Sequence, residues 1–387
     1  MNILLALDSI KDFENSIEIG NYFKEELESE NVNNEVNILP FLDGGMGTVE
    51  IMKEVIGGDF SYVNVHNPLS EAVTSRYIIK ENLCVMEMAQ ACGLRLLYKD
   101  KLDVMESSSI GLGEMIVDGL NNGCEKFFIG IGDTATNDMG MGMLYALGVR
   151  FFDKNLNSLN PVAKNMIKVD SIDMSGLDRR IMDVDLEIAT SQPLTLFQRN
   201  SFLEKRPIRK GASPDEILQL EKACKHFSKK VSEALGVSAI DFPYLGAGGG
   251  VSWALYIFFR AKISNSMELV LSLLDFQKLV RDKDLLIITE NVDEFNGENS
   301  INLSKFAKRY NENIKIIFLQ DEDYPNMRDN PYIDDIYKFK IKSNLERGDY
   351  EKEIRSVART FISDNLSQME NKFEKEELWL REKWQEF

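Results

Sequence analysis

The sequence has few histidines and cysteines, the residues that histidine-based catalysis and zinc-type metal centres need. Its 387 residues include only two histidines, His66 and His226, and neither lies in a motif. The four cysteines lack the close spacing of metal-ligand motifs, which fits a reducing cytoplasmic location better than a disulfide framework. They are Cys84, Cys92, Cys124 and Cys224. Histidine catalysis is therefore disfavoured.

Long apolar runs and excess positive charge are also lacking. Asp8 and Lys11 interrupt the N-terminal apolar run early, so neither a signal peptide nor a membrane span is expected. The formal net charge of -18 argues against nucleic acid or an anionic membrane as a partner. At 44% apolar and 28% charged residues, the chain resembles an ordinary globular protein with room for two domains. We expect a small-molecule substrate, and the sequence leaves open whether the chain forms a homo-oligomer.

The stretch 126–143 joins an apolar run to a polar, glycine-rich turn. Residues 127–131 predict a strand buried on both faces, and residues 142–147 predict a helix that ends at Gly148. Ligands of open α/β sheets bind beyond the carboxyl ends of strands, where helix N-termini present free N–H groups. The turn residues that can donate to a phosphate or hold a metal are Thr134, Thr136, Asn137 and Asp138. A capped turn without any ligand explains the same residues equally well.

Similar arrangements recur along the chain. Residues 2–7 predict a strand that ends at Asp8, Ser9 and Lys11. Residues 35–41 predict another, which leads into the turn 43–48, and a third glycine-rich turn at 245–250 precedes an apolar helix. The spacing matches neither a P-loop nor a dinucleotide fingerprint. Several such turns favour a phosphate-handling crevice, although tight turns with positive φ would also require glycines.

The order of elements predicts the fold class. Short β-rich segments follow from about residue 58, and regular alternation of helix and strand returns after Asp284. We expect an α/β protein with a discontinuous Rossmann-like parallel-sheet domain formed by residues 1–60 plus 285–387. Residues 61–284 would form a large inserted mixed α/β domain, with a cleft between the two. The tail 373–387 predicts a charged amphipathic helix.

Taken together and in chain order, the motifs resemble the bacterial type of glycerate kinase. The matching segments are Asp8-Ser9-x-Lys11, Pro40-x-x-Asp43-Gly-Gly-x-Gly-Thr48, Glu87-Met-Ala89, Gly111-x-Gly-Glu114, Gly130-Ile-Gly132, Ala135-Thr-Asn-Asp138 and Lys210-Gly-Ala212. The resemblance runs to about residue 300 and more loosely to about 370. It implies transfer of the ATP γ-phosphate to a hydroxyl of D-glycerate, with Mg²⁺, in a cleft between two α/β domains.

For such a reaction we expect an in-line transfer that needs mainly positioning and charge neutralisation, and the residues at strand ends and in the turns suggest particular roles. Catalytic candidates are Asp43, Asp138 and Lys11. Candidates for binding nucleotide phosphates are Gly44, Gly45, Gly47, Thr48, Gly132, Thr134 and Asn137. Candidates for binding the substrate are Asp8, Ser9, Arg76 and Lys210. Candidate Mg²⁺ ligands are Asp138 and Glu290.

Several loops depart from the family pattern. Met46 stands where Glu is usual, Asp133 replaces a glycine, and glycine is expected at Met139. Residues 189–194 lack an acidic residue, and Arg206-Pro-Ile-Arg-Lys-Gly211 replaces Phe-Gly-Pro-Gln-Lys-Gly. Two alternatives to an active glycerate kinase follow: a kinase of this scaffold for another small hydroxy acid, and a catalytically impaired paralogue that binds a ligand. If Asp133 points at the phosphates, we expect it either to bind Mg²⁺ or to weaken nucleotide binding.

Overall fold

The computed structural model describes residues 1–8, 16–204, 206–290, 298–322, 330–341 and 347–366. The chain divides into two compact units. The first combines Met1–Phe41 with Val270–Phe387, and the second is Leu42–Leu269. The first unit is thus built from both ends of the sequence, with the second inserted between them.

The first unit is a parallel sheet of five strands in the order β13-β12-β11-β1-β2. The strands are β1 (Asn2–Leu7), β2 (Glu35–Ile38), β11 (Leu285–Thr289), β12 (Lys315–Asp321) and β13 (Asp335–Phe339). Ile3 of β1 pairs with Leu285 of β11 on one side and with Val36 of β2 on the other. The N-terminal strand and the strand that follows residue 284 therefore share one sheet, as the alternation of elements predicts.

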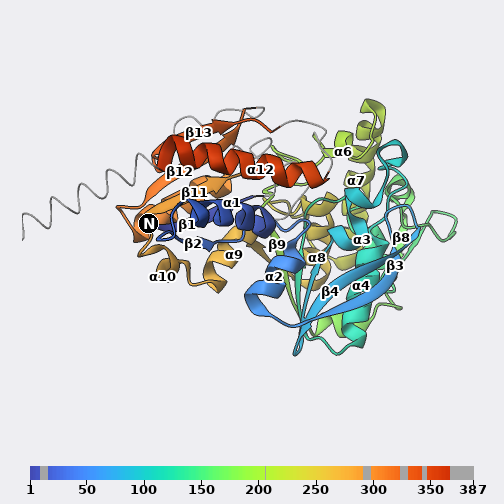
Figure 1. Ribbon diagram of the computed structural model, residues 1–387. Helices are drawn as coiled ribbons and strands as arrows, with labels where there is room; N and C mark the ends of the chain where they lie inside the picture. Colours follow the sequence, from blue (N-terminus) through green and yellow to red (C-terminus); the bar gives the residue numbers. More distant parts are fainter. Residues whose placement is uncertain (9–15, 205, 291–297, 323–329, 342–346, 367–387) are drawn as a thin grey trace, which may run out of the picture. The chain divides into compact units, whose positions relative to one another are not determined.

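Helices α1 (Ser16–Glu30) and α12 (Arg347–Phe361) lie side by side over one face of this sheet (Figure 1). The side chains of Ile3 and Leu5 in β1 belong to the same buried cluster as Phe23 of α1 and Ile354 of α12. Leu4, which points to the opposite face, is also fully buried. A strand buried on both faces explains why β1 is a continuous apolar run rather than an alternating one. The unit also contains α10 (Phe276–Val280), α11 (Glu298–Tyr310) and a π-helical turn, Ile362–Leu366.

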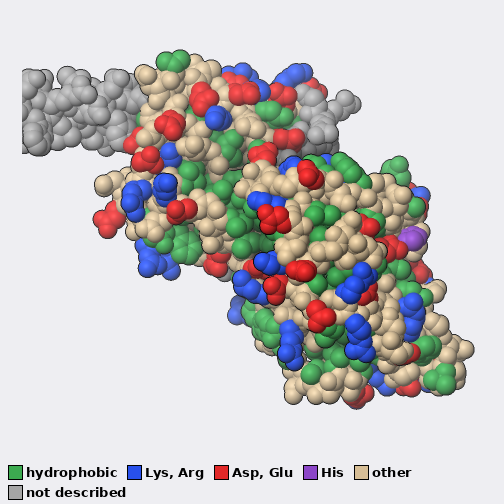
Figure 2. Space-filling view, turned by 90° about the horizontal axis from the view of Figure 1, so that it is seen from below, with side chains coloured by type: hydrophobic (Ala, Val, Ile, Leu, Met, Phe, Trp, Pro, Cys, Tyr) green, Lys and Arg blue, Asp and Glu red, His purple; other side chains and the backbone are tan. Residues whose placement is uncertain are grey.

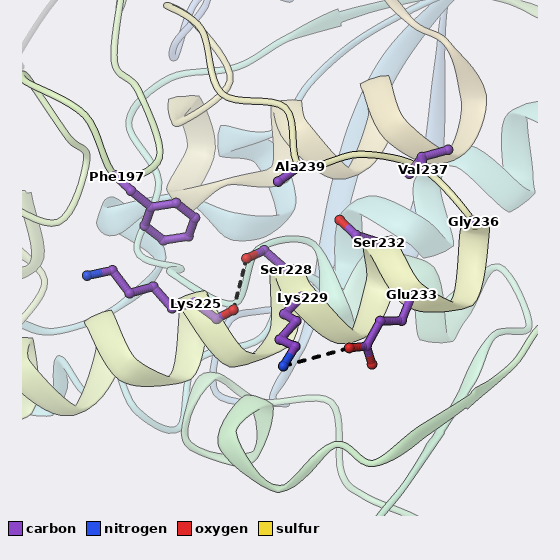
Figure 3. A pocket seen from close by; sticks show the side chains of 9 residues that line it. All are labelled: Phe197, Lys225, Ser228, Lys229, Ser232, Glu233, Gly236, Val237 and Ala239. Carbon is purple, nitrogen blue, oxygen red and sulfur yellow. Dashed lines mark hydrogen bonds and ion pairs between the residues drawn. The ribbon is translucent and has the colours of Figure 1, made fainter.

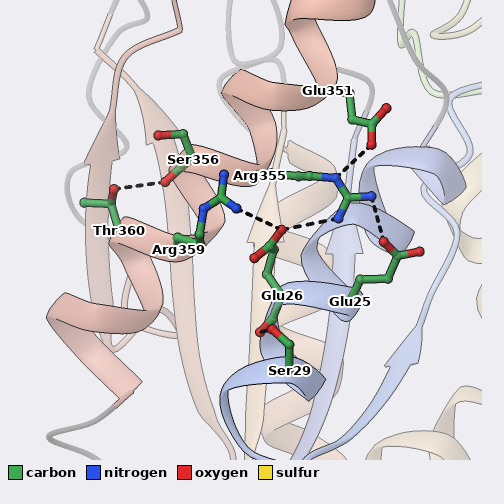
Figure 4. A network of polar contacts seen from close by, with 8 residues as sticks. All are labelled: Glu25, Glu26, Ser29, Glu351, Arg355, Ser356, Arg359 and Thr360. Atoms are coloured by element: carbon green, nitrogen blue, oxygen red, sulfur yellow. Dashed lines mark hydrogen bonds and ion pairs between the residues drawn. The ribbon is translucent and has the colours of Figure 1, made fainter.

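An ionic network joins α1 to α12 (Figure 4). The Arg355 guanidinium donates to three carboxylates, those of Glu351 (2.8 Å), Glu25 (2.7 Å) and Glu26 (3.3 Å). Arg359 reaches Glu26 at 3.5 Å, but its side chain is 60% exposed against 22% for Arg355. We infer that Arg355 is the stronger of the two contacts, because it is better shielded from water and forms more hydrogen bonds.

The second unit contains a six-stranded mixed sheet in the order β10-β9-β6-β5-β4-β3. Its strands are β3 (Asp59–His66), β4 (Ala72–Lys80), β5 (Leu83–Glu87), β6 (Lys126–Gly130), β9 (Asp185–Thr190) and β10 (Lys262–Asn265). The strands from β5 to β10 run parallel, whereas β3 and β4 are antiparallel. Strands β7 (Arg150–Phe152) and β8 (Ser171–Asp173) form a separate antiparallel pair. The predicted fold class, a parallel-sheet unit with an inserted mixed α/β unit, is confirmed.

The helices of the second unit are α2 (Thr48–Ile56), α3 (Ala89–Cys92), α4 (Ile110–Asn121), α5 (Met141–Ala146), α6 (Arg206–Arg209), α7 (Pro214–Leu235) and α8 (Val251–Phe259). Three of them, α2, α5 and α8, follow the glycine-rich turns predicted from the sequence. Helix α9 (Ser266–Leu273) contains the boundary between the two units, which falls after Leu269. Helix α7 shows most clearly how local sequence sets the two ends of a helix. Ser213 and Glu216 form a capping box at its start, with proline at the first helical position, and Gly236 ends it at φ 66°.

The boundaries between the units differ from the expected positions near residues 60 and 285. Helix α2 contacts β4 and β5, so residues 42–60 belong with the second sheet. Helix α10 contacts α11, so residues 270–284 belong with the first. A change of local pattern marks where element types change, but it does not reveal on which sheet a helix packs.

The surface carries charges of both signs. In Figure 2, acidic and basic side chains are interspersed over the face shown, so the net charge of -18 is not gathered into one acidic patch there. Across the part of the chain that the structure describes, no helix has the length and apolar character needed to cross a bilayer. The amphipathic tail helix predicted for residues 373–387 lies outside the described residues.

Candidate functional site

The turn 43–48 packs backbone to backbone against the carboxyl ends of β6 and β9 in the second sheet. A Cβ atom on Gly44 would lie 2.3 Å from the Ala189 carbonyl oxygen, and one on Gly132 would lie 2.7 Å from the Gly45 backbone nitrogen. A Cβ on Gly130 would lie 2.8 Å from the Gly44 carbonyl oxygen. The glycines are thus required for close packing of the turn 43–48 against the ends of β6 and β9, whether or not a ligand binds.

The protein's own carboxylates occupy backbone donors of the turn 43–48. Three N–H groups in and just after the turn donate to three carboxylates from different parts of the second unit. The pairs are Gly45 with Asp43 (2.7 Å), Met46 with Asp133 (3.0 Å) and Val49 with Glu87 (3.0 Å). Of the predicted phosphate-binding residues, Gly45 is one of these donors, and in this structure its N–H group binds a carboxyl side chain of the same chain. Phosphate binding by this turn stays a prediction.

Glu87 is a buried carboxyl at the N-terminus of α2 that sequence reasoning did not single out as a site residue. It ends β5, is fully buried, and its Oε1 accepts a hydrogen bond from the Gln90 amide at 2.9 Å. Burial, reinforced by the charge of Glu50, raises the pKa of Glu87 to about 8, although hydrogen bonds pull it downward. Asp8 is a predicted site residue because it follows a buried strand at its carboxyl end. The same rule would select Glu87, which ends β5.

Asp43 and Asp133 approach each other around Gly45. A Cβ atom on Gly45 would lie 2.3 Å from Asp133 Oδ2 and 3.1 Å from Asp43 Oδ1, so these two oxygens are at most about 5.4 Å apart. Asp43 is partly buried and Asp133 is exposed. Both carboxylates therefore lie against the backbone of the turn 43–48.

The carboxylate pair fits Mg²⁺ that arrives with a nucleotide. Among the residues that the structure describes, no group of three or more His, Cys, Asp or Glu side chains could hold a metal. Mg²⁺ at phosphoryl-transfer sites usually keeps several waters and takes only one or two protein carboxylates in addition to phosphate oxygens. Asp43 alone supplies one such carboxylate, which meets that requirement without Asp133, whereas a fully protein-enclosed ion would need more ligands.

Two positions where glycine is expected have left-handed backbones. The φ angle is 51° at Asp133 and 49° at Met139. Non-glycine residues adopt this conformation at a cost of roughly 1–2 kcal/mol, although aspartate tolerates it better than most. The backbone has therefore kept the shape for which glycine is suited, while the side chains have changed.

The buried side chain of Asp138 holds the starts of two helices together. Its side chain is fully buried and accepts hydrogen bonds from the Ser109 N–H (2.8 Å), the Ser109 hydroxyl (2.8 Å), the Gly142 N–H (3.0 Å) and the Gly140 N–H (3.2 Å). These contacts join the starts of α4 and α5. Burial raises its pKa, and the hydrogen bonds act in the opposite direction. The predicted catalytic and metal-binding roles do not fit a carboxylate whose two oxygens already accept four hydrogen bonds away from solvent.

Lys210 is a buried cation that fixes the turn after β6. Its Nζ donates to Asn137 Oδ1 (2.6 Å) and the Thr136 carbonyl (2.8 Å), and lies 3.3 Å from Thr134 Oγ1. Burial first, and then the charge of Arg206, lower its pKa to about 7. With its oxygen taken by Lys210, the Asn137 amide leaves its Nδ2 as a buried donor without a hydrogen-bond partner in the structure. Lys210, which the sequence suggested as a substrate-binding residue, therefore directs its ammonium group at the residues of the turn 134–137.

A pocket opens beside this turn, entirely within the second unit. Its lining residues are Leu94, Asp133, Thr134, Gln192, Leu194, Phe202, Arg206, Arg209, Lys210, Gly246, Gly248 and Gly249. It thus brings together Thr134 and Lys210, the third glycine-rich turn and the two arginines that depart from the family pattern. Asp133 links it to the turn 43–48 through its hydrogen bond to Met46. We take this pocket and the adjoining turn as the candidate site.

A second pocket, of about 510 Å³, lies against one face of α7 (Figure 3). Phe197 and Ala239 line it with residues of α7, among which Lys229 and Glu233 are paired at 3.8 Å. No residue of the glycine-rich turns is in its lining. It is therefore a less suitable candidate for phosphate chemistry than the pocket beside Asp133.

Other predicted residues lie elsewhere. Arg76, in β4, forms an ion pair with Glu50 and lies 5.1 Å above the Phe60 ring, so its charge already serves the packing of α2 on the sheet. These contacts give no support to the prediction that Arg76 binds the substrate. Met46, which replaces a usual glutamate, receives the Arg95 guanidinium on its sulfur at 3.2 Å.

In the first unit, Asp8 and Glu290 follow the paired strands β1 and β11. The Asp8 N–H donates to the Thr289 carbonyl at 3.3 Å, which places the two acids at neighbouring strand ends. Glu290 accepts from the Ser300 N–H at 2.7 Å, so it caps the start of α11, and burial raises its pKa. Ser9 and Lys11 lie outside the described residues. That residues of both units line one cleft stays a prediction.

The comparisons with known proteins agree with the order of motifs. Residues 3–337 match the Glycerate kinase family. The chain is 33% identical over 315 residues to a glycerate kinase of Bacillus subtilis, covering 80% of this chain and 82% of that one. It is 31% identical over 317 residues to a glycerate 2-kinase of Escherichia coli, covering 81% and 83%. A crystal structure from Salmonella typhimurium, titled as a glycerate kinase 2, superposes with a TM-score of 0.77 at 29% identity and covers 96% of this chain and 99% of that one. The chain belongs to the glycerate kinase family.

Proposed function

We propose that the protein transfers the γ-phosphate of ATP to a hydroxyl group of D-glycerate, with Mg²⁺. The observation that carries the proposal is the direct connection, through Asp133, between the donor-rich turn 43–48 and a cationic pocket in a chain of this family. Backbone donors suit the phosphates, and the pocket suits a small anionic acceptor. The reacting groups would meet close to Asp43 and Asp133.

Each part of the site would have a distinct task. The turn 44–47 would bind phosphate oxygens through N–H groups that Asp43 and Asp133 occupy in this structure. Thr134 and the arginines of α6 would bind the acceptor carboxylate, and Lys210 would hold Thr134 and Asn137 in place. Asp43 would hold Mg²⁺, which when bound neutralises charge on the transferred phosphoryl group.

In phosphoryl transfer of this kind, the protein itself needs to form few or no covalent bonds to the substrate. The transition state is loose, so positioning and charge neutralisation supply most of the rate, and no histidine base is required. We place the reaction in the cytoplasm, where ATP is available. The four cysteines, all of them buried and unpaired, suit a reducing compartment.

Coupled ADP release from the whole protein, with D-glycerate and with or without Mg²⁺, tests the proposal. We expect Mg²⁺-dependent turnover, and Asp43→Asn should lower kcat by roughly a hundredfold because it weakens charge stabilisation at the phosphate. Asp153→Asn is the matched control, since Asp153 also accepts backbone N–H groups but lies in an exposed loop. Absence of turnover in the unmodified protein, or equal losses in both variants, would contradict the proposal.

An impaired, ligand-binding paralogue is the second candidate. Asp133 favours it, because its carboxylate already occupies the Met46 N–H at 3.0 Å and adds negative charge where phosphates should bind. Such a protein would bind the hydroxy acid without releasing ADP. The same assay, combined with calorimetric titration of D-glycerate, separates the two functions.

A further inference from the structure

The charge of the candidate pocket exceeds what D-glycerate needs. Two arginines, Arg206 and Arg209, lie among its described lining residues together with Lys210, whose pKa of about 7 leaves it partly charged at neutral pH, and Asp133 is the single carboxylate among them. D-Glycerate brings one carboxylate. In a chain with a net charge of -18, such a local excess of positive charge focuses the field on an anionic ligand.

The two arginines, rather than Lys210, are placed to contact a ligand. Lys210 is 7% exposed, and its ammonium group is directed at three acceptors within the turn 134–137. Arg206 is partly exposed and Arg209 is exposed, and both lie on the single turn of α6 at the pocket wall. Arginine presents a planar set of donors that matches a carboxylate in a two-point contact.

The cations also repel one another. Both arginines contribute to the lowered pKa of Lys210, after the larger effect of burial. A bound anion with a single charge would relieve part of this repulsion, and one with two charges would relieve more of it. The pocket is therefore better matched by a ligand that carries two acidic groups.

We infer that the preferred acceptor is a small hydroxy dicarboxylate, in which one carboxylate meets each arginine, rather than D-glycerate. Its hydroxyl would still attack the γ-phosphate, so this assignment rests on the phosphoryl transfer proposed above. A bond forms between the hydroxyl oxygen and the γ-phosphorus, the bond to the β–γ bridging oxygen breaks, ADP leaves, and the hydroxyl proton passes to solvent. The arginines would thus determine specificity.

Calorimetric titration of the whole protein without nucleotide gives the first test, with tartronate, both malate enantiomers and D-glycerate as ligands. We expect at least one dicarboxylate to bind on the order of tenfold to a hundredfold more tightly than D-glycerate, the range expected for one additional charged hydrogen-bonding contact. Coupled ADP release should show the same preference in kcat/KM. Equal or weaker binding of every dicarboxylate would overturn the assignment.

Substitution of the arginines gives the second test. Arg206→Gln and Arg209→Gln should each reduce dicarboxylate affinity by about tenfold and reduce D-glycerate affinity less. Lys225→Gln is the matched control, because Lys225 is an exposed cation on α7 paired with Glu221, and it should change neither affinity. Thermal unfolding of each variant verifies that it is folded.

The outcomes separate this inference from the proposed function. If the arginine variants weaken Mg-ATP binding and leave acceptor preference unchanged, the cations serve the nucleotide and the inference is wrong. If D-glycerate is phosphorylated without any preference for dicarboxylates, the function stands and the inference fails. If dicarboxylates bind tightly through the arginines but no acceptor is phosphorylated, the pocket assignment stands and the proposed function fails.

Discussion

Asp133 should limit nucleotide binding, and its replacement should reveal by how much. Its Oδ2 accepts the Met46 N–H at 3.0 Å, and its backbone adopts φ 51°, a conformation that suits glycine. Asp133→Gly removes a negative charge, frees one backbone donor and relieves backbone strain. We therefore expect tighter binding of Mg-ATP.

The magnitude follows from the exposure of Asp133. Two unit charges 4 Å apart interact by about 1 kcal/mol in water, and an exposed carboxylate experiences a dielectric close to that of water. Against the net charge of Mg-ATP the repulsion amounts to about 1–2 kcal/mol, or roughly 5- to 30-fold in affinity. A buried carboxylate would cost much more. The strain relieved and the hydrogen bond lost are each about 1 kcal/mol, so the stability of the variant should change little.

Calorimetric titration with Mg-ATP measures the effect, and Asp133→Asn separates its two causes. Asparagine tolerates the left-handed backbone and keeps an acceptor oxygen, but it lacks the charge. We expect the order of affinity Gly, then Asn, then the unmodified protein. Unchanged or weaker binding in Asp133→Gly would refute the repulsion, and weaker binding in both variants would identify Asp133 as a Mg²⁺ ligand.

Three further predictions concern buried or networked charges. Asp138→Asn should destabilise the fold by about 2–4 kcal/mol in urea unfolding, because four donors lose a carboxylate, whereas unchanged stability with lost turnover would restore a catalytic role. The pKa of Glu87 is about 8 in the folded state, above its unfolded value, so its contribution to stability is lost as pH rises from about 5 to 8. Glu87→Gln should therefore flatten the decline in unfolding free energy over this pH range. An unchanged slope would contradict the raised pKa. Arg355→Ala should cost about 1 kcal/mol of stability, and Arg359→Ala less than about half of that; equal effects would disprove the ranking of the two contacts.

Strands and the fold class could be predicted because buried strands impose a local apolar pattern. The run 285–289 is buried along its whole length, and its pairing with β1 follows from the regular alternation of helix and strand. The unit boundaries could not be placed in this way, since the contact of α2 with β4 and β5 is made between elements distant in sequence.

The site could be predicted only in part. Residue type and position after a strand identified the turn 43–48, but they could not tell that its donors already bind carboxylates. The same rule selected Asp138, where a polar residue proved to join two helix starts. Whether a carboxylate contacts solvent or backbone depends on packing partners that lie about 30 residues away, as Ser109 does from Asp138, and no local pattern encodes them.

Detection of phosphoglycerate by ³¹P nuclear magnetic resonance, after incubation of the whole protein with D-glycerate and Mg-ATP, tests the central claim most directly. The proposed function predicts a phosphomonoester signal that grows in step with ADP, at a rate within the roughly 1–100 per second typical of kinases or below it if Asp133 impedes nucleotide binding. Formation of ADP with inorganic phosphate alone, or no consumption of ATP at saturating nucleotide, would contradict it.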